Sequence, residues 1–232
     1  MKNAGMAAVY YKLGIRYFNL NRYKESEVAF NLALHIYPTY SAAWYYRGIV
    51  LEKLGRDDEA IKSYDKSLMT KPLEKNTWFN RGVALQNVGR YAEAIESYDE
   101  VLNIDPTYIL ALNNRGYAFI KIGRYEEAIK SYDEALKIDP TFLIAMNNRA
   151  RTLEQIGRYE EAIESYDQAL KIDPTFILAL SNRGRALEQI GRYNEAIASY
   201  DGALRIDPDY KEALKNRKCA IERKKTGSPP IG

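Results

Sequence analysis

The stretch G-R-Y-E-E-A-I-K-S-Y-D-E-A-L-K-I-D-P-T, Gly123–Thr141, decides the fold of this chain. It returns almost letter for letter 34 residues later, at Gly157–Thr175, and more loosely at Gly191–Asp209 and nearer the N-terminus. The same spacing of 34 residues separates the prolines Pro38, Pro72, Pro106, Pro140, Pro174 and Pro208. A fixed period of this size indicates stacked supersecondary units, each of which needs its neighbours to bury its apolar face.

Each unit is predicted to contain two helices. In the unit that surrounds the quoted stretch, Leu112 and Phe119 have helical spacing, and Gly123 is placed to end the first helix. The second helix is expected to begin near Tyr125 and to stop before Pro140, because proline cannot extend a helix. Its apolar stripe is Tyr125, Ala128, Ile129, Tyr132, Ala135, Leu136 and Ile138.

The period sets the expected domain organisation. The predicted repeats are 7–40, 41–74, 75–108, 109–142, 143–176 and 177–210. Residues 211–225 are predicted to form a further helix that caps the open end, because Lys218 stands where each repeat has a small residue. Residues 226–232 have the composition of a flexible tail.

The composition is that of an ordinary globular protein. Of 232 residues, 46% are hydrophobic and 28% are charged, and the formal net charge is only +3. A single cysteine, Cys219, excludes an internal disulfide. No stretch has the length and apolar character of a membrane span or a signal peptide, so the cytoplasm is the expected compartment.

The repeat pattern resembles the tetratricopeptide repeat family. The family's columns of large, small and aromatic residues are filled in the second unit by Trp44, Gly48, Ala60, Tyr64, Ser67 and Pro72. The resemblance implies an all-α solenoid, a right-handed superhelix of antiparallel helix pairs. In it, first helices line a concave face and second helices cover the convex face. It also implies binding of a protein or peptide ligand rather than catalysis.

Two charged columns depart from the family pattern. Arginine stands before the small residue and aspartate stands eighteen positions later in repeats two to six. These residues are Arg47, Arg81, Arg115, Arg149 and Arg183, with Asp65, Asp99, Asp133, Asp167 and Asp201. We predict a structural Arg–Asp pair within each of these repeats, since the planar guanidinium fork matches a carboxylate. A functional anion site is the alternative.

The candidate ligand-binding residues begin with a column of asparagines on the predicted concave face: Asn80, Asn114, Asn148 and Asn182. Asparagine is a mediocre helix former, so helix propensity does not explain its recurrence. Its amide both donates and accepts hydrogen bonds and could hold the main chain of an extended peptide. The alternatives are that this asparagine ties one helix to the next, or that it was copied when the repeat was duplicated.

Neighbouring columns predict a groove with two parts. The N-terminal part is aromatic, with Tyr45, Tyr46 and Phe79 as candidate anchors for apolar ligand groups. The polar part contains the candidate residues Asn113, Asn147, Tyr117, Lys121, Arg151, Gln155, Arg185 and Gln189. The aromatic part also fits self-association, so a homo-oligomer built through the N-terminal repeats is the alternative function.

Charge is segregated between the two helices of each repeat. The first-helix windows are basic and the second-helix windows are acidic. The predicted Arg–Asp pairs remove part of the positive charge, and Arg151 and Arg185 have Glu154 and Glu188 three residues later. The groove is therefore expected to be mixed in charge. The lysine-rich C-terminal end is interpreted as a solvated cap, and nucleic-acid binding is disfavoured.

Residues for catalysis are missing from the pattern. His35 is the only histidine, no Cys/His cluster could hold zinc, and the glycines recur at turn and packing positions rather than in a phosphate-binding loop. We therefore expect no enzyme activity, no cofactor and no small-molecule substrate.

Overall fold

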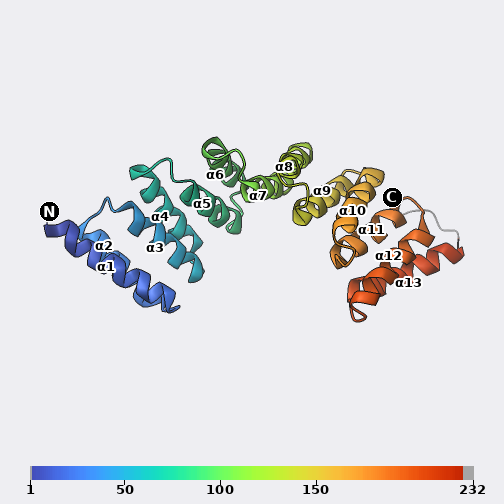
Figure 1. The fold of residues 1–232 in the computed structure, drawn as a ribbon, viewed down its shortest axis with the longest axis horizontal. Helices are drawn as coiled ribbons and strands as arrows, with labels where there is room; N and C mark the ends of the chain where they lie inside the picture. Colours follow the sequence, from blue (N-terminus) through green and yellow to red (C-terminus); the bar gives the residue numbers. More distant parts are fainter. Residues whose placement is uncertain (1, 227–232) are drawn as a thin grey trace. The chain divides into compact units, whose positions relative to one another are not determined.

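The computed structural model describes residues 2–226, which form thirteen α-helices (Figure 1). The chain divides into two compact units, of which the N-terminal one ends at Ile122 and the C-terminal one starts at Gly123. The N-terminal unit contains α1 (Lys2–Asn19), α2 (Tyr23–Ile36), α3 (Ser41–Lys53), α4 (Asp57–Thr70), α5 (Lys75–Asn87), α6 (Tyr91–Ile104) and α7 (Ile109–Lys121). The C-terminal unit contains α8 (Tyr125–Ile138), α9 (Leu143–Gln155), α10 (Tyr159–Ile172), α11 (Ile177–Gln189), α12 (Tyr193–Ile206) and α13 (Lys211–Thr226).

Glycine makes the turn from an odd-numbered helix to the next even-numbered one, as the sequence predicted. Gly55 after α3 and Gly89 after α5 have φ angles of 71° and 78°, in the left-handed region. The amide of Arg56 then donates to the carbonyl of Leu51 at 2.9 Å, which satisfies a helix-end acceptor. Asn21, with a φ of 57°, makes the same turn after α1.

Aspartate and threonine shape the turn that leads into the next pair. The amide and hydroxyl of Thr141 donate to Asp139 Oδ1 at 2.9 and 2.7 Å, and Thr175 contacts Asp173 in the same way. These hydrogen bonds from Thr141 lower the pKa of Asp139 below its ordinary value. The turn is therefore held locally, next to the proline that stops the helix.

The helix pairs that lie within one unit close around an aromatic ring. The tyrosines Tyr64, Tyr98, Tyr132, Tyr166 and Tyr200 are completely buried. A Cβ atom added to Gly82 would lie 2.6 Å from the ring of Tyr98, and one added to Gly184 would lie 2.5 Å from the ring of Tyr200. The small residue on the first helix therefore makes room for the ring on the second helix.

The helices of each unit form two layers. Consecutive helices pack against each other within a unit, and each odd-numbered helix also contacts the next odd-numbered one. Among the described residues of either unit, no such contact joins even-numbered helices. The odd-numbered helices, which are the first helices of the pairs, therefore lie closer together and form the inner layer.

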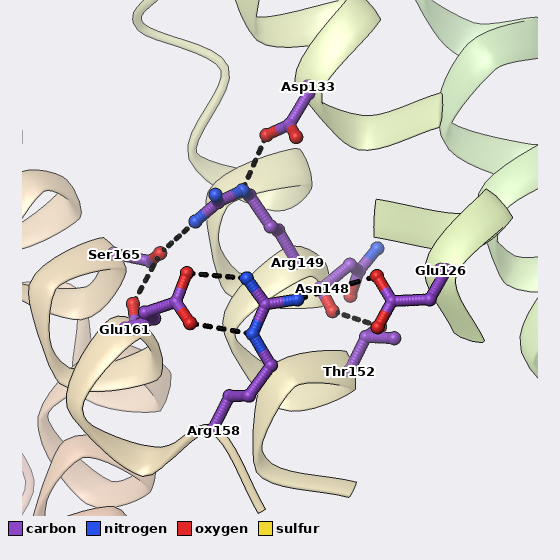
Figure 2. A network of polar contacts seen from close by, with 8 residues as sticks. All are labelled: Glu126, Asp133, Asn148, Arg149, Thr152, Arg158, Glu161 and Ser165. Atoms are coloured by element: carbon purple, nitrogen blue, oxygen red, sulfur yellow. Dashed lines mark hydrogen bonds and ion pairs between the residues drawn. The ribbon is translucent and has the colours of Figure 1, made fainter. Parts of the chain in front are cut away.

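The Arg–Asp pairs form, but with a different register from the predicted one. From the third repeat onward, each arginine binds the aspartate of the preceding repeat instead of the aspartate of its own repeat, and Arg47 in the second repeat binds Asn31. The Nε atoms of Arg81, Arg149 and Arg183 lie 2.7, 2.5 and 2.6 Å from Oδ1 of Asp65, Asp133 and Asp167, and Arg115 Nη1 lies 2.9 Å from Asp99 Oδ1. In Arg81, Arg149 and Arg183, the Nη1 group of the guanidinium donates to a serine in the arginine's own repeat. Arg149 Nη1, for example, donates to Ser165 Oγ at 2.6 Å (Figure 2).

Helix geometry explains the error in the predicted register. A first helix packs between two second helices, one from its own repeat and one from the repeat before. The serine sixteen residues after the arginine faces it, as Ser165 faces Arg149. An aspartate two residues further along the same helix is rotated by about 200° and faces the following repeat. The arginine column therefore connects repeats rather than closing each one.

Helix α13 continues this pattern at the C-terminal end. Arg217 Nε lies 2.5 Å from Asp201 Oδ1, and Ala213 and Ala220 are buried against the preceding pair. Lys218 is exposed. Of the residues predicted as a flexible tail, Thr226 is the last residue of α13, and 227–232 lie outside the described residues.

Candidate functional site

The predicted ligand-binding residues all lie on odd-numbered helices, in the inner layer of their own unit. In the N-terminal unit these are Tyr45, Tyr46, Phe79, Asn80, Asn113, Asn114, Tyr117 and Lys121. In the C-terminal unit they are Asn147, Asn148, Arg151, Gln155, Asn182, Arg185 and Gln189.

Aromatic rings from neighbouring helices meet on the inner layer of the N-terminal unit. The ring of Tyr46 lies 5.2 Å from that of Tyr45 and 5.9 Å from that of Tyr11 on α1. Phe79 on α5 lies 5.2 Å from Tyr108, edge to face. All of these rings are half-buried, whereas the aromatic column on the even-numbered helices is fully buried. The inner layer of this unit therefore presents apolar area that its own packing does not cover.

The asparagine column is not uniformly available to a ligand. Asn182 is 8% exposed and donates to Asn147 Oδ1 at 3.0 Å, while Asn147 is itself only 6% exposed. Asn80 Nδ2 donates to the hydroxyl of Tyr45 at 3.3 Å. Both bonds join an asparagine to the residue 35 positions earlier, in the preceding repeat. These contacts support the structural alternative for Asn182 and Asn80.

The remaining asparagines have mixed surroundings. Asn113 is 9% exposed and donates to Asn114 Oδ1 at 3.2 Å. Asn114 and Asn148 are half-buried. The hydroxyl of Thr152 donates to the backbone carbonyl oxygen of Asn148 at 2.7 Å (Figure 2). Asn80, Asn114 and Asn148 therefore keep part of their surface exposed, unlike Asn113, Asn147 and Asn182.

Polar residues on the inner layer of the C-terminal unit bind one another across repeats. Arg185 Nε lies 3.0 Å from Oε2 of Glu154, and Arg223 Nη1 lies 3.2 Å from Oε2 of Glu188. Both carboxylates are buried, with side chains 8% and 7% exposed. The predicted pairing of Arg185 with Glu188 three residues later is therefore wrong, because the guanidinium reaches back to the preceding repeat.

Exposed polar groups remain beside these pairs. Arg151 and Gln155 on α9 are exposed, and Gln189 on α11 is half-buried. In the N-terminal unit, Tyr117 is 38% exposed, and Lys121 Nζ lies 5.1 Å from the centre of its ring. These side chains are the accessible part of the predicted polar surface.

One column of functional interest was missed at the sequence level. For four of the five buried tyrosines, the residue twelve positions earlier accepts a hydrogen bond from the tyrosine hydroxyl, whereas Ile120 stands at that position before Tyr132. Tyr166 donates to Glu154 at 2.5 Å, Tyr200 to Glu188 at 2.6 Å and Tyr98 to Gln86 at 3.4 Å, and Tyr64 donates to Glu52. The signal was present in the sequence as carboxyl and amide residues that recur at the period of 34.

Glu52 differs from its counterparts in the C-terminal unit. Glu154 and Glu188 each have an arginine partner, whereas no cation forms an ion pair with Glu52 within residues 2–226. Burial raises the pKa of Glu52 above its ordinary value, and the hydrogen bond from Tyr64 opposes that shift only in part. Asp57 raises this pKa further, and the neighbouring Lys53 lowers it. The N-terminal unit therefore holds a partly buried carboxyl group without a cationic partner.

The arginines that follow the turn glycines are paired rather than free. Arg56 binds Glu59 at 2.6 Å, Arg90 binds Glu93 at 2.5 Å and Arg158 binds Glu161 at 2.6 Å (Figure 2). The same i, i+3 pair forms after α1, α7 and α11. The prediction of a mixed rather than strongly basic surface agrees with these pairs.

Residues 2–226 contain neither a metal-binding cluster nor a membrane-spanning helix. No group of three or more His, Cys, Asp or Glu side chains could hold a metal ion in that range. None of the helices formed by those residues is long and apolar enough to cross a membrane.

Comparison with protein families identifies the repeats. Models of the tetratricopeptide repeat match residues 7–40, 41–73, 74–141, 113–175 and 153–218. The chain therefore belongs to the tetratricopeptide repeat family, whose members are typically non-catalytic scaffolds for protein interactions. A search of curated proteins finds no match to the chain.

Solved structures share the fold. The C-terminal part of a TPR repeat-containing protein from Cytophaga hutchinsonii has a TM-score of 0.78 at 20% identity, covering 90% of this chain and 87% of that one. PilW, a type IV pilus biogenesis factor, has a TM-score of 0.72 at 22% identity over 90% of this chain and 97% of its own. YrrB, described as a TPR protein with an unusual peptide-binding site, has a TM-score of 0.67 at 19% identity over 82% and 98%. At these identities the likeness is one of fold.

Proposed function

We propose that this protein is an interaction scaffold that binds an extended peptide segment of a partner protein along the inner layer of its helices. The observation that carries this proposal is the half-buried aromatic group Tyr45, Tyr46 and Phe79 in the N-terminal unit. Aromatic side chains that pack only on one side offer rigid apolar contact area for a ligand. The peptide-binding protein YrrB, which has the same fold, is consistent with this use.

The half-buried asparagines would contact the main chain of the ligand. In the unit that contains the aromatic group, these asparagines are Asn80 and Asn114. An amide that both donates and accepts can pair with a peptide group whatever the ligand's sequence. We therefore propose that the aromatic rings select apolar side chains while the asparagines hold the backbone.

Glu52 adds a preference for a basic ligand side chain. Its carboxyl group is partly buried and has no ion-pair partner within the described chain, so its ionised form is poorly stabilised. A ligand lysine or arginine beside Glu52 would favour the ionised form and form a charge-assisted hydrogen bond. The preferred ligand is therefore an extended peptide with aromatic or aliphatic anchors and a nearby basic residue.

Peptide display against the full chain, followed by fluorescence anisotropy with a selected peptide, tests this function. Asn80→Ala, Tyr117→Ser and Glu52→Gln should each weaken binding by roughly tenfold, as loss of a contact at the centre of an interface does. Glu96→Ala, on the exposed surface of α6, is the matched control and should bind like the wild type. Circular dichroism checks that every variant is folded.

The same assay can reject the proposal. If the folded inner-layer variants bind as tightly as Glu96→Ala, the ligand contacts another surface. If replacing the ligand's basic residue by glutamine weakens wild type and Glu52→Gln equally, the role of Glu52 is excluded while peptide binding by the inner layer stands.

Self-association is a second candidate, favoured by the apolar end of the N-terminal unit. A surface hollow there is lined by Leu13, Tyr17, Val28 and Leu32 from α1 and α2. Val28 is 59% exposed and Leu32 is 42% exposed. A mass that rises with concentration in light scattering, and returns to that of a monomer in Val28→Glu, would support it. A constant monomer mass would exclude it.

A further inference from the structure

A second hollow of the N-terminal unit lies between α2 and α4, with α3 beneath it, away from the inner-layer surface described above. It has a volume of about 450 Å³. Its polar and aromatic lining is Asn31 and His35 from α2, Trp44 and Arg47 from α3, and Lys62 and Lys66 from α4. Within this lining there is no carboxylate, while three side chains carry a full positive charge.

Arg47, the first residue of the arginine column, forms the floor of the hollow. Arg47 Nε donates to Asn31 Oδ1 at 2.7 Å, and its Nη1 donates to Ser63 Oγ at 2.6 Å. The guanidinium stacks over Trp44, 5.6 Å from the ring centre. Its Nη2 group makes no hydrogen bond to any residue within 2–226. Asparagine stands here where the following repeats have aspartate, so the amide accepts a hydrogen bond without neutralising the charge.

The carboxylates nearest to this guanidinium are already engaged. Glu27 and Glu59 both bind Arg56, at 2.7 and 2.6 Å. Asp65 binds Arg81 at 2.7 Å. Burial lowers the pKa of Arg47, and the attraction of Glu27 and Glu59 offsets this only in part. The positive charge in the floor is thus incompletely compensated by the protein itself.

Among the six repeats, only the second has lysine at both of the wall positions. Lys62 and Lys66 are exposed, and neither forms an ion pair with another residue in the described range. Along α4, Glu59 lies three residues before Lys62, and Asp65 lies three residues after Lys62 and next to Lys66. Glu59 is paired with Arg56, and Asp65 is paired with Arg81. In the later repeats the positions of Lys62 and Lys66 are occupied, in chain order, by Glu96 and Glu100, Lys130 and Glu134, Glu164 and Gln168, and Ala198 and Gly202.

The C-terminal unit contains the matching hollow with a different charge. It is lined by Asp133, Lys137, Arg149, Ser165 and Gln168, among others. Here Arg149 Nε has an acidic partner, Asp133, at 2.5 Å (Figure 2). The arginine of this hollow is therefore neutralised, whereas the hollow of the N-terminal unit has an asparagine in place of the aspartate and two added lysines.

We infer that the hollow formed by Asn31, Arg47, Lys62 and Lys66 is a binding site for an oxyanion, namely a carboxylate of an acidic peptide segment. The free Arg47 Nη2 and the Asn31 amide would donate to the carboxylate oxygens. The lysines supply long-range attraction and further donors. This site is separate from the inner-layer site, and its occupation does not depend on the function proposed there.

The two tryptophans of the chain allow anion binding at the hollow to be followed by NMR. Trp44 lines the hollow, and Trp78 occupies the equivalent position one repeat later, where the helices carry Asp65, Glu96 and Glu100. Each indole N–H donates to a proline carbonyl at 2.7 Å. Titration of the full chain with a short oligoglutamate peptide at low ionic strength should shift the Trp44 indole NMR signal and leave that of Trp78 in place. A matched oligoglutamine peptide should move neither signal.

Three variants test the assignment. Asn31→Asp restores the acidic partner that the other arginines have, so it should keep the fold and reduce oligoglutamate affinity by roughly tenfold. The double change Lys62→Glu and Lys66→Gln copies the residues of the matching hollow and should have at least that effect. Lys130→Glu, an exposed lysine in the same column of the C-terminal unit, alters net charge alone and should leave affinity within about twofold.

Several results would overturn the inference. The inference is wrong if oligoglutamate leaves the Trp44 indole signal in place or shifts both indole signals equally. It is also wrong if Lys130→Glu and Asn31→Asp weaken oligoglutamate binding equally. Inorganic phosphate serves as the comparison probe. Binding of phosphate without binding of oligoglutamate would assign the hollow to a free anion and reject the acidic peptide.

Discussion

Glycine at the small-residue position is required by the tyrosine ring that it faces. At Gly82 an added Cβ would lie 2.6 Å from Tyr98, a ring with no exposed surface, so the ring or the helix must move. Ala150 occupies the equivalent position in the fifth repeat, so a single methyl group can be accommodated there by small shifts. A branched side chain exceeds that tolerance.

Gly82→Val should therefore destabilise the protein. Overpacking of this kind costs roughly 1–3 kcal/mol, which outweighs the gain from removing a helical glycine. Urea denaturation followed by circular dichroism measures the change. Gly5→Val is the control, because an added Cβ at Gly5 meets nothing within 4 Å. Equal stability of the two variants would contradict the packing argument.

A second prediction at the residue scale concerns the pH dependence of stability. Burial raises the pKa of Glu52 in the folded chain above its value in the unfolded chain. The Glu52 carboxyl group therefore holds its proton more tightly in the folded chain than in the unfolded chain. Its contribution to the free energy of unfolding becomes less favourable as the pH rises through and above the ordinary pKa of glutamate. Glu52→Gln removes this dependence.

The difference in unfolding free energy between Glu52→Gln and wild type should therefore grow in favour of the variant from about pH 4 to pH 7. Denaturation curves at matched pH values measure it. A difference that stays constant, or one that shrinks as pH rises, would show that the carboxyl group is not destabilised by burial.

At the scale of the helices, the arginine column determines how one pair joins the next. Arg183 contacts Asp167 in the preceding repeat at 2.6 Å and Ser199 in its own repeat at 2.6 Å, and its side chain is only 20% exposed. Within residues 2–226, Arg192 in the turn after α11 binds Glu195 alone, and both side chains are more than 40% exposed. The two arginines are thus equal in charge but different in what they connect.

Replacement of Arg183 by methionine should cost roughly 1–3 kcal/mol of unfolding free energy, since it leaves half-buried polar groups without a donor. Arg192→Met should cost less than about 1 kcal/mol, as exposed ion pairs do. Thermal or chemical denaturation of both variants makes the comparison. A larger loss of unfolding free energy in Arg192→Met than in Arg183→Met would show that the contact between repeats is not the stronger of the two.

At the scale of the whole molecule, stability is expected to propagate between neighbours. Helix α13 buries Ala213 and Ala220 and supplies Arg217 and Arg223 to carboxylates of the preceding repeat. Without it, the buried carboxylate of Glu188 loses its cation. The two compact units, divided after Ile122, give a natural limit to how far such a loss extends.

Deletion of residues 211–232 should lower the melting temperature and increase amide hydrogen exchange first in α11 and α12. Exchange in α1 to α6 should stay close to that of the full chain, because repeats contact only their neighbours. Hydrogen-exchange mass spectrometry resolves the two regions. Uniform loss of protection along the chain would contradict nearest-neighbour stability.

The all-helical repeat fold, the turn glycines and the tyrosine packing column could be predicted from the amino-acid sequence. These follow from local rules: a period of 34, helical spacing of apolar residues, and a residue that tolerates positive φ where the chain turns. The sequence also placed the aromatic group of Tyr45, Tyr46 and Phe79 on the first helices, where the rings are half-buried.

The repeat that each polar side chain binds could not be predicted, because it depends on how the helices pack in space. Arg149 could meet an aspartate on either side, and rotation around the helix directs it to Asp133 rather than Asp167. The same stacking buries Asn182 against Asn147 and turns Arg185 toward Glu154. The repeat period shows which residues are equivalent in different repeats. Each first helix is flanked by two second helices, so the period does not show which of them supplies the binding partner. The packing of the helices selects that partner.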